Sequence, residues 1–256
     1  MEFTMIGAGN VAFHLSCALK NAGHQPLAVY NRTFEKAAEL AGKLGCKSLR
    51  NLNDLQDNGG LVILAVSDDA IAGIAGKINL RSSILVHTSG SVDIKVLHQS
   101  ASHTGVIYPL QTFSLRRNVK FSEIPLFIEA NTPGTLQKLL NIGRSISGSV
   151  YESSSHQRAK LHLAAVFACN FTNHMYNIAA RVIDEIELPF EILKPLILET
   201  ASKINDIDPA DAQTGPSIRN DKSVIKKHID LLSGHPGYQK IYTFVSESIY
   251  RQKCKK

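Results

Sequence analysis

The stretch "TMIGAGNVAFHL", residues 4–15, decides the fold of this 256-residue chain. Gly7, Gly9 and Ala12 have the G-x-G-x-x-[GA] spacing, after an apolar segment and at the start of a helical pattern. The first glycine permits a tight turn, the second lets the backbone approach a pyrophosphate, and the small third residue lets helix and strand pack closely. An ordinary strand-turn-helix glycine pair is the alternative. The pattern favours a dinucleotide site, and its phosphates are expected to meet the helix N-terminus at Gly7, Ala8, Gly9, Asn10 and Val11.

Strands and helices alternate along the first 153 residues. Apolar segments predict strands at 3–6, 26–31, 61–66, 83–89, 105–110, 125–130 and 149–153. Helical spacing predicts helices at 10–22, 34–45, 68–78 and 134–146. This alternation predicts an α/β fold, a Rossmann-like doubly wound and mostly parallel sheet.

After about residue 154 the strand patterns stop, and an all-helical C-terminal domain is expected. Residues 156–186 have helical spacing without proline, and further helical stretches follow at 190–206, 221–232 and 236–252. Thirty helical residues span about 45 Å, and a helix of that length usually crosses an interface. We therefore expect a nucleotide-binding domain at 1–153 and a helical substrate and dimerisation domain at 154–256.

The end of the second strand, "YNRTFEK", indicates which nucleotide binds. An NAD site normally has an acid here for the ribose hydroxyls, and this chain has none. Asn31, Arg32 and Thr33 offer neutral and cationic donors instead, and Arg32 suits a 2′-phosphate. NADP is thus the expected cofactor, although Arg32 could be a surface residue and Thr33 is expected to cap the next helix.

Two further segments end strands at the edge of the sheet where ligands bind. The small residues Ala65, Val66 and Ser67 follow one strand, and Thr88 and Ser89 of "HTSGS" follow another, so all five are expected at the cofactor. The adjoining Asp68 and Asp69 are expected to cap a helix rather than to act in catalysis. His87 is expected to be a packed histidine.

Composition excludes several classes of function. The formal charge is +6, but the basic residues are scattered apart from the terminal "RQKCKK", so no nucleic-acid partner is expected. No apolar run approaches the roughly 20 residues of a membrane span. Cys17, Cys46, Cys169 and Cys254 lack metal-ligand or disulfide-framework spacing, so neither a metal site nor a disulfide is expected, and a reducing cytoplasm fits best.

Five ordered motifs carry a family resemblance over nearly the whole chain. They are "IGAGNVAFHL", "HTSGS", "YPLQTFS", "HLAAVFACNF" and "TGPSIRND". Together they resemble the NADP oxidoreductases that join a Rossmann-like domain to a C-terminal helical domain of unknown function, numbered 2520. The architecture is similar to that of pyrroline-5-carboxylate reductase, ketopantoate reductase and the β-hydroxyacid dehydrogenases. The resemblance implies a homodimer through the helical domain and a cleft for a small substrate, but no substrate identity.

One departure concerns catalysis. The β-hydroxyacid dehydrogenases carry Lys-x-x-x-Asn near the start of the long helix, whereas Lys160 is followed four residues later by Ala164. Their lysine-based proton transfer is therefore in doubt here, and Lys160 could be a solvated helix residue.

Other residues could contact a substrate. At 100° per residue His162, Cys169 and Asn173 form one helical stripe beside Asn170. His162 could donate a proton, with Asn170 and Ser89 as further catalytic candidates, or the stripe could satisfy itself in a dimer core. Cys169 fits a buried small apolar residue better. Arg219 and Asn173 are candidate substrate ligands, although Arg219 could instead pair with Asp221, which is expected to cap a helix.

Three functions remain open on these grounds. The first is an NADPH-dependent oxidoreductase that reduces a carbonyl or imine carbon of a small, carboxylated or uncarboxylated substrate. The second is a nucleotide-binding sensor or structural dimer without turnover, which the missing lysine supports. The third is a deazaflavin-linked NADP reductase.

Overall fold

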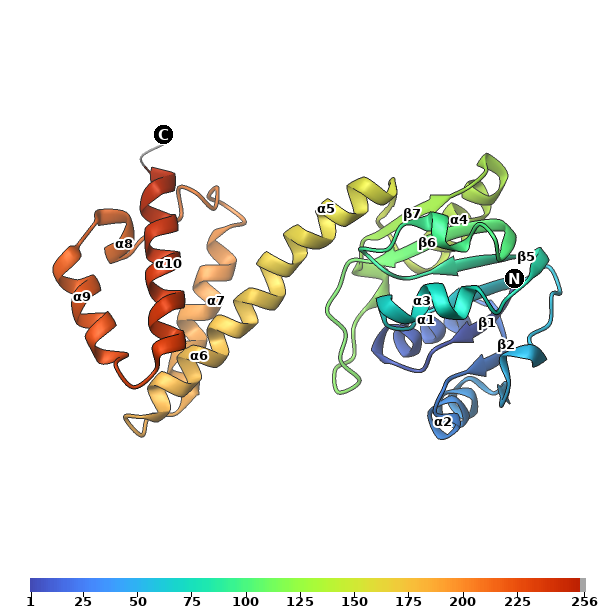
Figure 1. Cartoon of the computed structure of the whole chain (residues 1–256), viewed down its shortest axis with the longest axis horizontal. Coiled ribbons are helices and arrows are strands. Elements are labelled where there is room, and N and C mark those ends of the chain that lie inside the picture. Colours follow the sequence, from blue (N-terminus) through green and yellow to red (C-terminus); the bar gives the residue numbers. More distant parts are fainter. Residues whose placement is uncertain (254–256) are drawn as a thin grey trace. The chain divides into compact units, whose positions relative to one another are not determined.

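The computed structural model describes residues 1–253, and Cys254, one of the four cysteines, lies outside them. Within this range the first part of the chain forms an eight-stranded sheet with the order β3-β2-β1-β4-β5-β6-β7-β8 (Figure 1). The strands are β1 (Glu2–Ile6), β2 (Gln25–Tyr30), β3 (Lys47–Leu49), β4 (Leu61–Leu64), β5 (Leu80–His87), β6 (Ala101–Pro109), β7 (Leu126–Ala130) and β8 (Val150–Glu152). All neighbours are parallel except β6 and β7, which are antiparallel. The predicted Rossmann-like, mostly parallel sheet is confirmed.

Helices cover both faces of this sheet because each buried strand alternates between two cores. One core takes Phe3, Met5 and Ile63 from the strands. Against it pack α1 (Asn10–Asn21), α2 (Phe34–Leu44) and α4 (Pro133–Ile146). The second core takes Ile6 and Leu64 and is covered by α3 (Asp68–Ala75) and the 3-10 turn η2 (Ile94–Leu97). The doubly wound arrangement follows from this alternation.

Every regular element that the structure describes from Ser155 onward is helical, as the periodicity predicted. The chain continues as α5 (Ser155–Ala165), a π-helical segment (Val166–Phe171), α6 (Thr172–Asp184), α7 (Lys194–Lys203), α8 (Pro216–Arg219), α9 (Lys222–Leu231) and α10 (Pro236–Lys253). A capping box starts α5, because the Ser154 hydroxyl accepts from Gln157 N–H while the Gln157 side chain accepts from Ser154 N–H. Helices α8 and α9 pack against α10.

The described chain divides into two compact units, residues 1–170 and residues 171–253. The first unit holds the whole sheet together with α5, and the second holds α6 through α10. The change from mixed to purely helical structure comes earlier, between β8 and α5. None of the described helices combines the length and apolar character that crossing a membrane requires.

Some local predictions were wrong. Thr33 stands at the start of α2 but makes no side-chain capping bond, and Ser67, rather than Asp68 or Asp69, is the N-cap of α3. Both aspartates do lie in the first turn of α3, where the helix dipole favours negative charge. The capping role of Asp221 is confirmed, since its side chain accepts from Val224 N–H. The short β3 and α8 were not predicted, because three- and four-residue elements show no periodicity.

Candidate functional site

A cleft of about 1050 Å³ lies at the carboxyl ends of β1, β2, β4 and β5. The strand order reverses here, because β1 pairs with β2 on one side and with β4 on the other. Twelve residues predicted from the sequence line the cleft: Gly7, Ala8, Gly9, Asn10, Val11, Asn31, Arg32, Thr33, Ala65, Val66, Ser67 and Thr88. Of the expected cofactor residues, Ser89 alone is not among the lining residues. Four separate strand ends therefore converge on one cleft.

The two glycines of the turn meet different surroundings. Gly7 has φ +118°, and a Cβ there would lie 2.1 Å from the carbonyl oxygen of Ala65. Gly9 has an ordinary φ of −85°, and a Cβ there would meet nothing within 4 Å. Since Gly9 also lines the cleft, this space is open to a ligand. Gly7 is thus required by the fold, whereas Gly9 leaves room above the start of α1.

The start of α1 offers hydrogen-bond donors to that space. The first intrahelical bond runs from Phe13 N–H to Gly9 C=O, so the N–H groups of Asn10, Val11 and Ala12 have no acceptor within the helix. The first turn contains no acidic residue and no side-chain cap. An anionic group bound there would meet free N–H groups and the positive end of the helix dipole.

Cationic side chains mark the end of the cleft beside β2. Arg32 follows β2, and Lys36 follows it four residues later on α2; both line the cleft. Asn31 donates from Nδ2 to the Thr33 carbonyl oxygen at 3.0 Å, and this bond stabilises the turn that contains Arg32. These two cations suit an additional phosphate on the ribose, and no carboxylate from this turn competes with it.

The cleft has the length and chemistry of a dinucleotide site. Its lining runs from Arg32 beside β2, past the glycine turn, to Thr88 beside β5. Three strand spacings separate β2 from β5, which is about 14 Å. The cations thus lie where the ribose with its phosphate would bind, the free N–H groups lie where the pyrophosphate would bind, and the small residues lie where the ring would bind. A pyridine dinucleotide with a 2′-phosphate fits these residues.

The loop that follows β5 is held by its own hydrogen bonds. Ser89 Oγ accepts from Ser91 N–H and Val92 N–H, both at 3.1 Å, and Ser89 N–H donates to His87 Nδ1 at 3.2 Å. Ser91 in turn donates to the carboxylate of Asp68 at the start of α3. Ser89 is buried, so its hydroxyl serves the shape of the loop in this structure.

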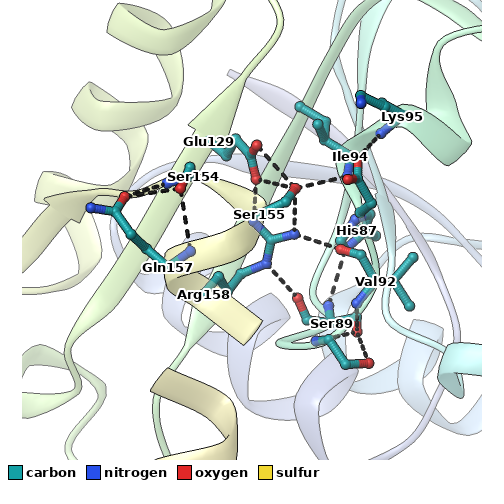
Figure 2. Close-up of polar contacts among 12 residues, drawn as sticks. His87, Ser89, Val92, Ile94, Lys95, Glu129, Ser154, Ser155, Gln157 and Arg158 are labelled. Atoms are coloured by element: carbon teal, nitrogen blue, oxygen red, sulfur yellow. Dashed lines mark hydrogen bonds and ion pairs between the residues drawn. The ribbon is translucent and has the colours of Figure 1, made fainter. Parts of the chain in front are cut away.

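Arg158 fixes the same loop from α5 (Figure 2). Its guanidinium is completely buried, forms an ion pair with Glu129, and donates to the carbonyl oxygens of Ser89 and Val92. Ser155 bridges the pair, since its hydroxyl donates to Glu129 at 2.8 Å and lies 3.2 Å from the guanidinium. No sequence pattern indicated this cluster, because a buried arginine and a surface arginine look alike in a helical pattern.

His87 lies beneath the loop and is buried, as predicted. Burial, reinforced by the charge of Arg158, lowers the pKa of His87 to about 4. The ring is therefore neutral at physiological pH, and its Nδ1 accepts from Ser89 N–H. His87 therefore supports the loop and stays in its neutral form near neutral pH.

Next to this loop, Tyr108 and His162 form a hydrogen-bonded pair. The Tyr108 hydroxyl of β6 lies 3.0 Å from Nδ1 of His162 on α5, and the two rings meet edge to face. Gly90 packs directly on both, because a Cβ there would lie 2.8 Å from His162 Nδ1 and from Tyr108 Cζ. Gly90 lies two residues after Thr88, which lines the cleft. At most about 7 Å therefore separates the Cα atoms of these two residues.

The remaining residues predicted to contact a substrate lie on later elements of the chain. Cys169 and Asn170 fall within the π-helical segment, Asn173 lies on α6, and Arg219 ends α8. Because π-helical bonding adds a residue to the turn, the stripe projected at 100° per residue does not hold across this segment. Asn170, Asn173 and Arg219 are exposed within the described structure, and no ion pair joins Arg219 to Asp221 there. Their substrate roles stay predictions.

Several lining residues were missed by the sequence analysis. They are Ile6, Tyr30, Lys36, Asn51, Leu52, Asn53, Ala70, Gly73, Ile74 and Lys77. Lys36 could have been found, since a residue four positions after Arg32 on the predicted helix lies near it. Asn51 and Asn53 follow the unpredicted β3, and no pattern marked them.

Two sequence profiles and one curated protein match parts of the chain. Residues 124–249 match the profile of a domain of unknown function, DUF2520, and residues 1–79 match that of shikimate / quinate 5-dehydrogenase. A glutamyl-tRNA reductase from Sulfurisphaera tokodaii is 42% identical over 48 residues, which span 19% of this chain and 12% of that enzyme.

Solved structures match over the full length. A Bacteroides fragilis protein assigned as an NADP oxidoreductase is 42% identical, with a TM-score of 0.92 and 98% of each chain covered. 1-Pyrroline-5-carboxylate reductase from Streptococcus pyogenes is 14% identical, with a TM-score of 0.65 and 98% of each chain covered. A reductive aminase from Aspergillus terreus, solved with NADPH and ethyl-5-oxohexanoate, is 12% identical, with a TM-score of 0.69 and coverage of 99% and 92%. The last two share the fold alone. The identity and full coverage of the first show that this chain belongs to the family of NADP oxidoreductases in which a Rossmann-like domain precedes a DUF2520 domain.

Proposed function

We propose that this protein is an NADPH-dependent reductase of a small carbonyl or imine compound, with His162 as the proton donor. The observation that carries the proposal is the position of the Tyr108–His162 pair, which packs on Gly90 only two residues from the cleft lining at Thr88. Histidine is the side chain that most often serves as a general acid or base, and this one lies near the β5 end of the cleft. Two structural relatives, named a 1-pyrroline-5-carboxylate reductase and a reductive aminase, support this reaction class.

The residues of the cleft would hold the cofactor along its length. The N–H groups of Asn10 and Val11 would bind the pyrophosphate, and Arg32 and Lys36 would bind the 2′-phosphate. When bound, NADPH supplies a hydride for the substrate carbon. Thr88 and the small residues Ala65 and Val66 would leave room for the ring.

His162 completes the reaction. As an imidazolium it would give its Nε2 proton to the substrate oxygen or nitrogen, which receives the electron pair of the reduced double bond. The ring is left neutral, with the proton on Nδ1 beside the Tyr108 oxygen. Roles for Arg219, Asn170 and Asn173 in binding a carboxylated substrate stay predictions.

A binding and turnover experiment tests this function. Nicotinamide fluorescence would be followed on mixing the protein with NADPH, and oxidation would then be followed with a panel of keto acids, imines and aldehydes. We expect a fluorescence change and turnover of at least one compound. The His162→Asn variant should still bind NADPH but lose about a hundredfold in kcat. The control is His156→Asn, which changes an exposed histidine on the same helix.

The second candidate is a nucleotide-binding sensor without turnover. It is favoured by Lys160, which is exposed and has Ala164 in place of the asparagine expected four residues later. Tight NADPH binding without oxidation by any panel member would favour the sensor. No fluorescence change with either NADPH or NADH would contradict both candidates.

We also infer that two copies associate through the helical unit. Among its described residues, large apolar side chains on α7 and α10 are exposed, such as Leu198 at 69% and Phe244 at 75%. Monomeric soluble proteins rarely expose large contiguous apolar patches, so residues of this kind suggest a surface that another molecule covers. A second copy of the chain would cover them with a like surface, in the symmetric manner of most homodimers.

A further inference from the structure

The hydrogen bond between Tyr108 and His162 has a preferred direction. The Tyr108 side chain is only 8% exposed, and His162 Nδ1 is its sole hydrogen-bond partner among residues 1–253. A neutral imidazole has one nitrogen that donates and one that accepts, whereas a phenol can do both. If Nδ1 donated, the phenol proton would be left without an acceptor inside the described structure, at a cost. The neutral pair therefore has the phenol donating to Nδ1 and the ring proton on Nε2.

The phenol is able to keep this role near neutral pH. Burial raises the pKa of Tyr108, and this outweighs the charge of Arg158, which acts in the opposite direction. The hydroxyl thus remains protonated over the range in which an imidazole titrates. When the ring is protonated, Nδ1–H can donate to the same oxygen, so the contact persists in both states.

We propose that Tyr108 is a positioning residue that holds His162 in the tautomer with a proton on Nε2, which fixes the proton donor of the reductase. This inference rests on the proposed function for its consequence, but the tautomer itself is a property of the resting protein. After Nε2 gives up its proton, the Tyr108 oxygen accepts from Nδ1–H. Nε2 then takes up a proton from water, which restores the imidazolium, and when Nδ1 releases its own proton to water the phenol returns to donating to Nδ1.

Gly90 makes the arrangement possible and links it to the cleft. Any side chain at residue 90 would enter the space of the His162 ring and the Tyr108 ring, since a Cβ would lie 2.8 Å from each. The backbone around Gly90 is held by Arg158, which binds the carbonyls of Ser89 and Val92 on either side of it. The pair is therefore placed against a fixed loop, as a proton donor requires.

Nitrogen NMR on the protein labelled with ¹⁵N-histidine tests the tautomer without turnover. The chain has ten histidines, so the His162→Asn variant would identify the signals of His162. In the neutral ring we expect Nδ1 unprotonated and Nε2 protonated. In Tyr108→Phe, the Nδ1 signal should move and the Nδ1–H tautomer should become populated. The matched control is Tyr151→Phe, which removes the hydroxyl of a tyrosine that stacks on Phe127. Tyr108, and not Tyr151, is bonded to His162, so the control should leave both His162 signals in place.

Kinetics then test the consequence. With a substrate from the panel, Tyr108→Phe should lower kcat about tenfold and leave KM for NADPH unchanged, because the phenol contacts His162 and not the cofactor. Two results would overturn the inference: a resting ring protonated on Nδ1, or identical His162 signals in Tyr108→Phe and the unchanged protein. If the tautomer shifts as expected but no compound is turned over, the positioning stands and the proposed reaction fails.

Discussion

The guanidinium of Arg158 and the carboxylate of Glu129 form an ion pair in which the arginine is completely buried and the glutamate is 15% exposed. Four acceptors surround the guanidinium: Glu129, Ser155 Oγ and the carbonyls of Ser89 and Val92. A buried charge is tolerated only when it is paired and its donors are satisfied. The pair therefore joins three parts of the chain, β7, the loop after β5 and the start of α5, into one rigid corner beside the cleft.

Removal of either partner of this ion pair should lower the free energy of unfolding. Glu129→Gln leaves Arg158 buried without a counter-charge, and we expect a loss of about 3 kcal/mol in the free energy of unfolding. Urea unfolding followed by circular dichroism measures this. The double variant Glu129→Gln with Arg158→Met should lose less than Glu129→Gln alone, because no orphan charge remains.

An exposed ion pair provides the control for this measurement. Lys43 and Glu39 lie 3.0 Å apart on α2 with side chains 53% and 70% exposed. Glu39→Gln should cost less than about 0.5 kcal/mol. Equal losses in Glu129→Gln and Glu39→Gln would mean that the buried pair does not stabilise this corner.

The neutral His87 should make stability depend on pH in a defined window. Its folded pKa of about 4 lies below the unfolded value of about 6.5, so between these values the unfolded chain binds a proton that the folded chain does not. Stability should therefore fall as the pH drops from about 6.5 to 4, by about 3 kcal/mol. His87→Gln should flatten this slope in unfolding curves measured at several pH values. His98→Gln, at an exposed position, should keep it.

The two glycines of the turn should respond differently to the same substitution. Gly9→Ala places a methyl group in open space, so the free energy of unfolding should change by less than about 1 kcal/mol while NADPH binding weakens at least tenfold. Gly7→Ala combines a positive φ with a contact to the Ala65 carbonyl, so this variant should be strongly destabilised. Melting curves and calorimetric titration of both variants distinguish the roles. Unchanged NADPH affinity in folded Gly9→Ala would show that the ligand does not lie over this turn.

The cations beside β2 should decide between the two nicotinamide cofactors. Arg32→Ala removes a charge-assisted contact and should weaken NADPH binding by 10- to 100-fold, as about 1.5–3 kcal/mol predicts, while leaving NADH binding nearly unchanged. Lys36→Ala should act in the same direction. Calorimetry with both nucleotides checks this, with Arg81→Ala as a control of equal charge change outside the cleft. Equal effects on NADPH and NADH would contradict recognition of the 2′-phosphate.

The sequence predicted the residues that line the cleft better than it predicted the Tyr108–His162 pair, for a physical reason. Gly7, Gly9 and Arg32 belong to one local strand-turn-helix-strand unit, in which spacing alone dictates where each residue lies. The Tyr108–His162 contact joins residues 54 positions apart, and only the pairing of β6 and the docking of α5 bring them together. His162 could be suspected from its residue type, but its partner could not.

The π-helical segment illustrates the same limit at the local scale. Periodicity correctly predicted a helix through Val166–Phe171, but it assumed a constant rotation per residue. A change to i→i+5 bonding leaves the apolar pattern almost unaltered, but it breaks the constant 100° step from which the stripe was projected. Side-chain directions at Cys169 and Asn170 therefore do not follow from the periodicity.

The exposed apolar residues of the helical unit should control association. We expect sedimentation velocity to show a dimer, and Leu198→Glu or Phe244→Glu to weaken it about a hundredfold, since an unpaired charge buried in the interface costs about 3 kcal/mol. Helical circular dichroism should be retained, because both side chains are more than two-thirds exposed in the single chain. Leu115→Glu, at an exposed site in the sheet-containing unit, is the control and should leave the dimer intact. A monomeric unchanged protein at micromolar concentration would contradict self-association, and these residues would then need a partner of another kind.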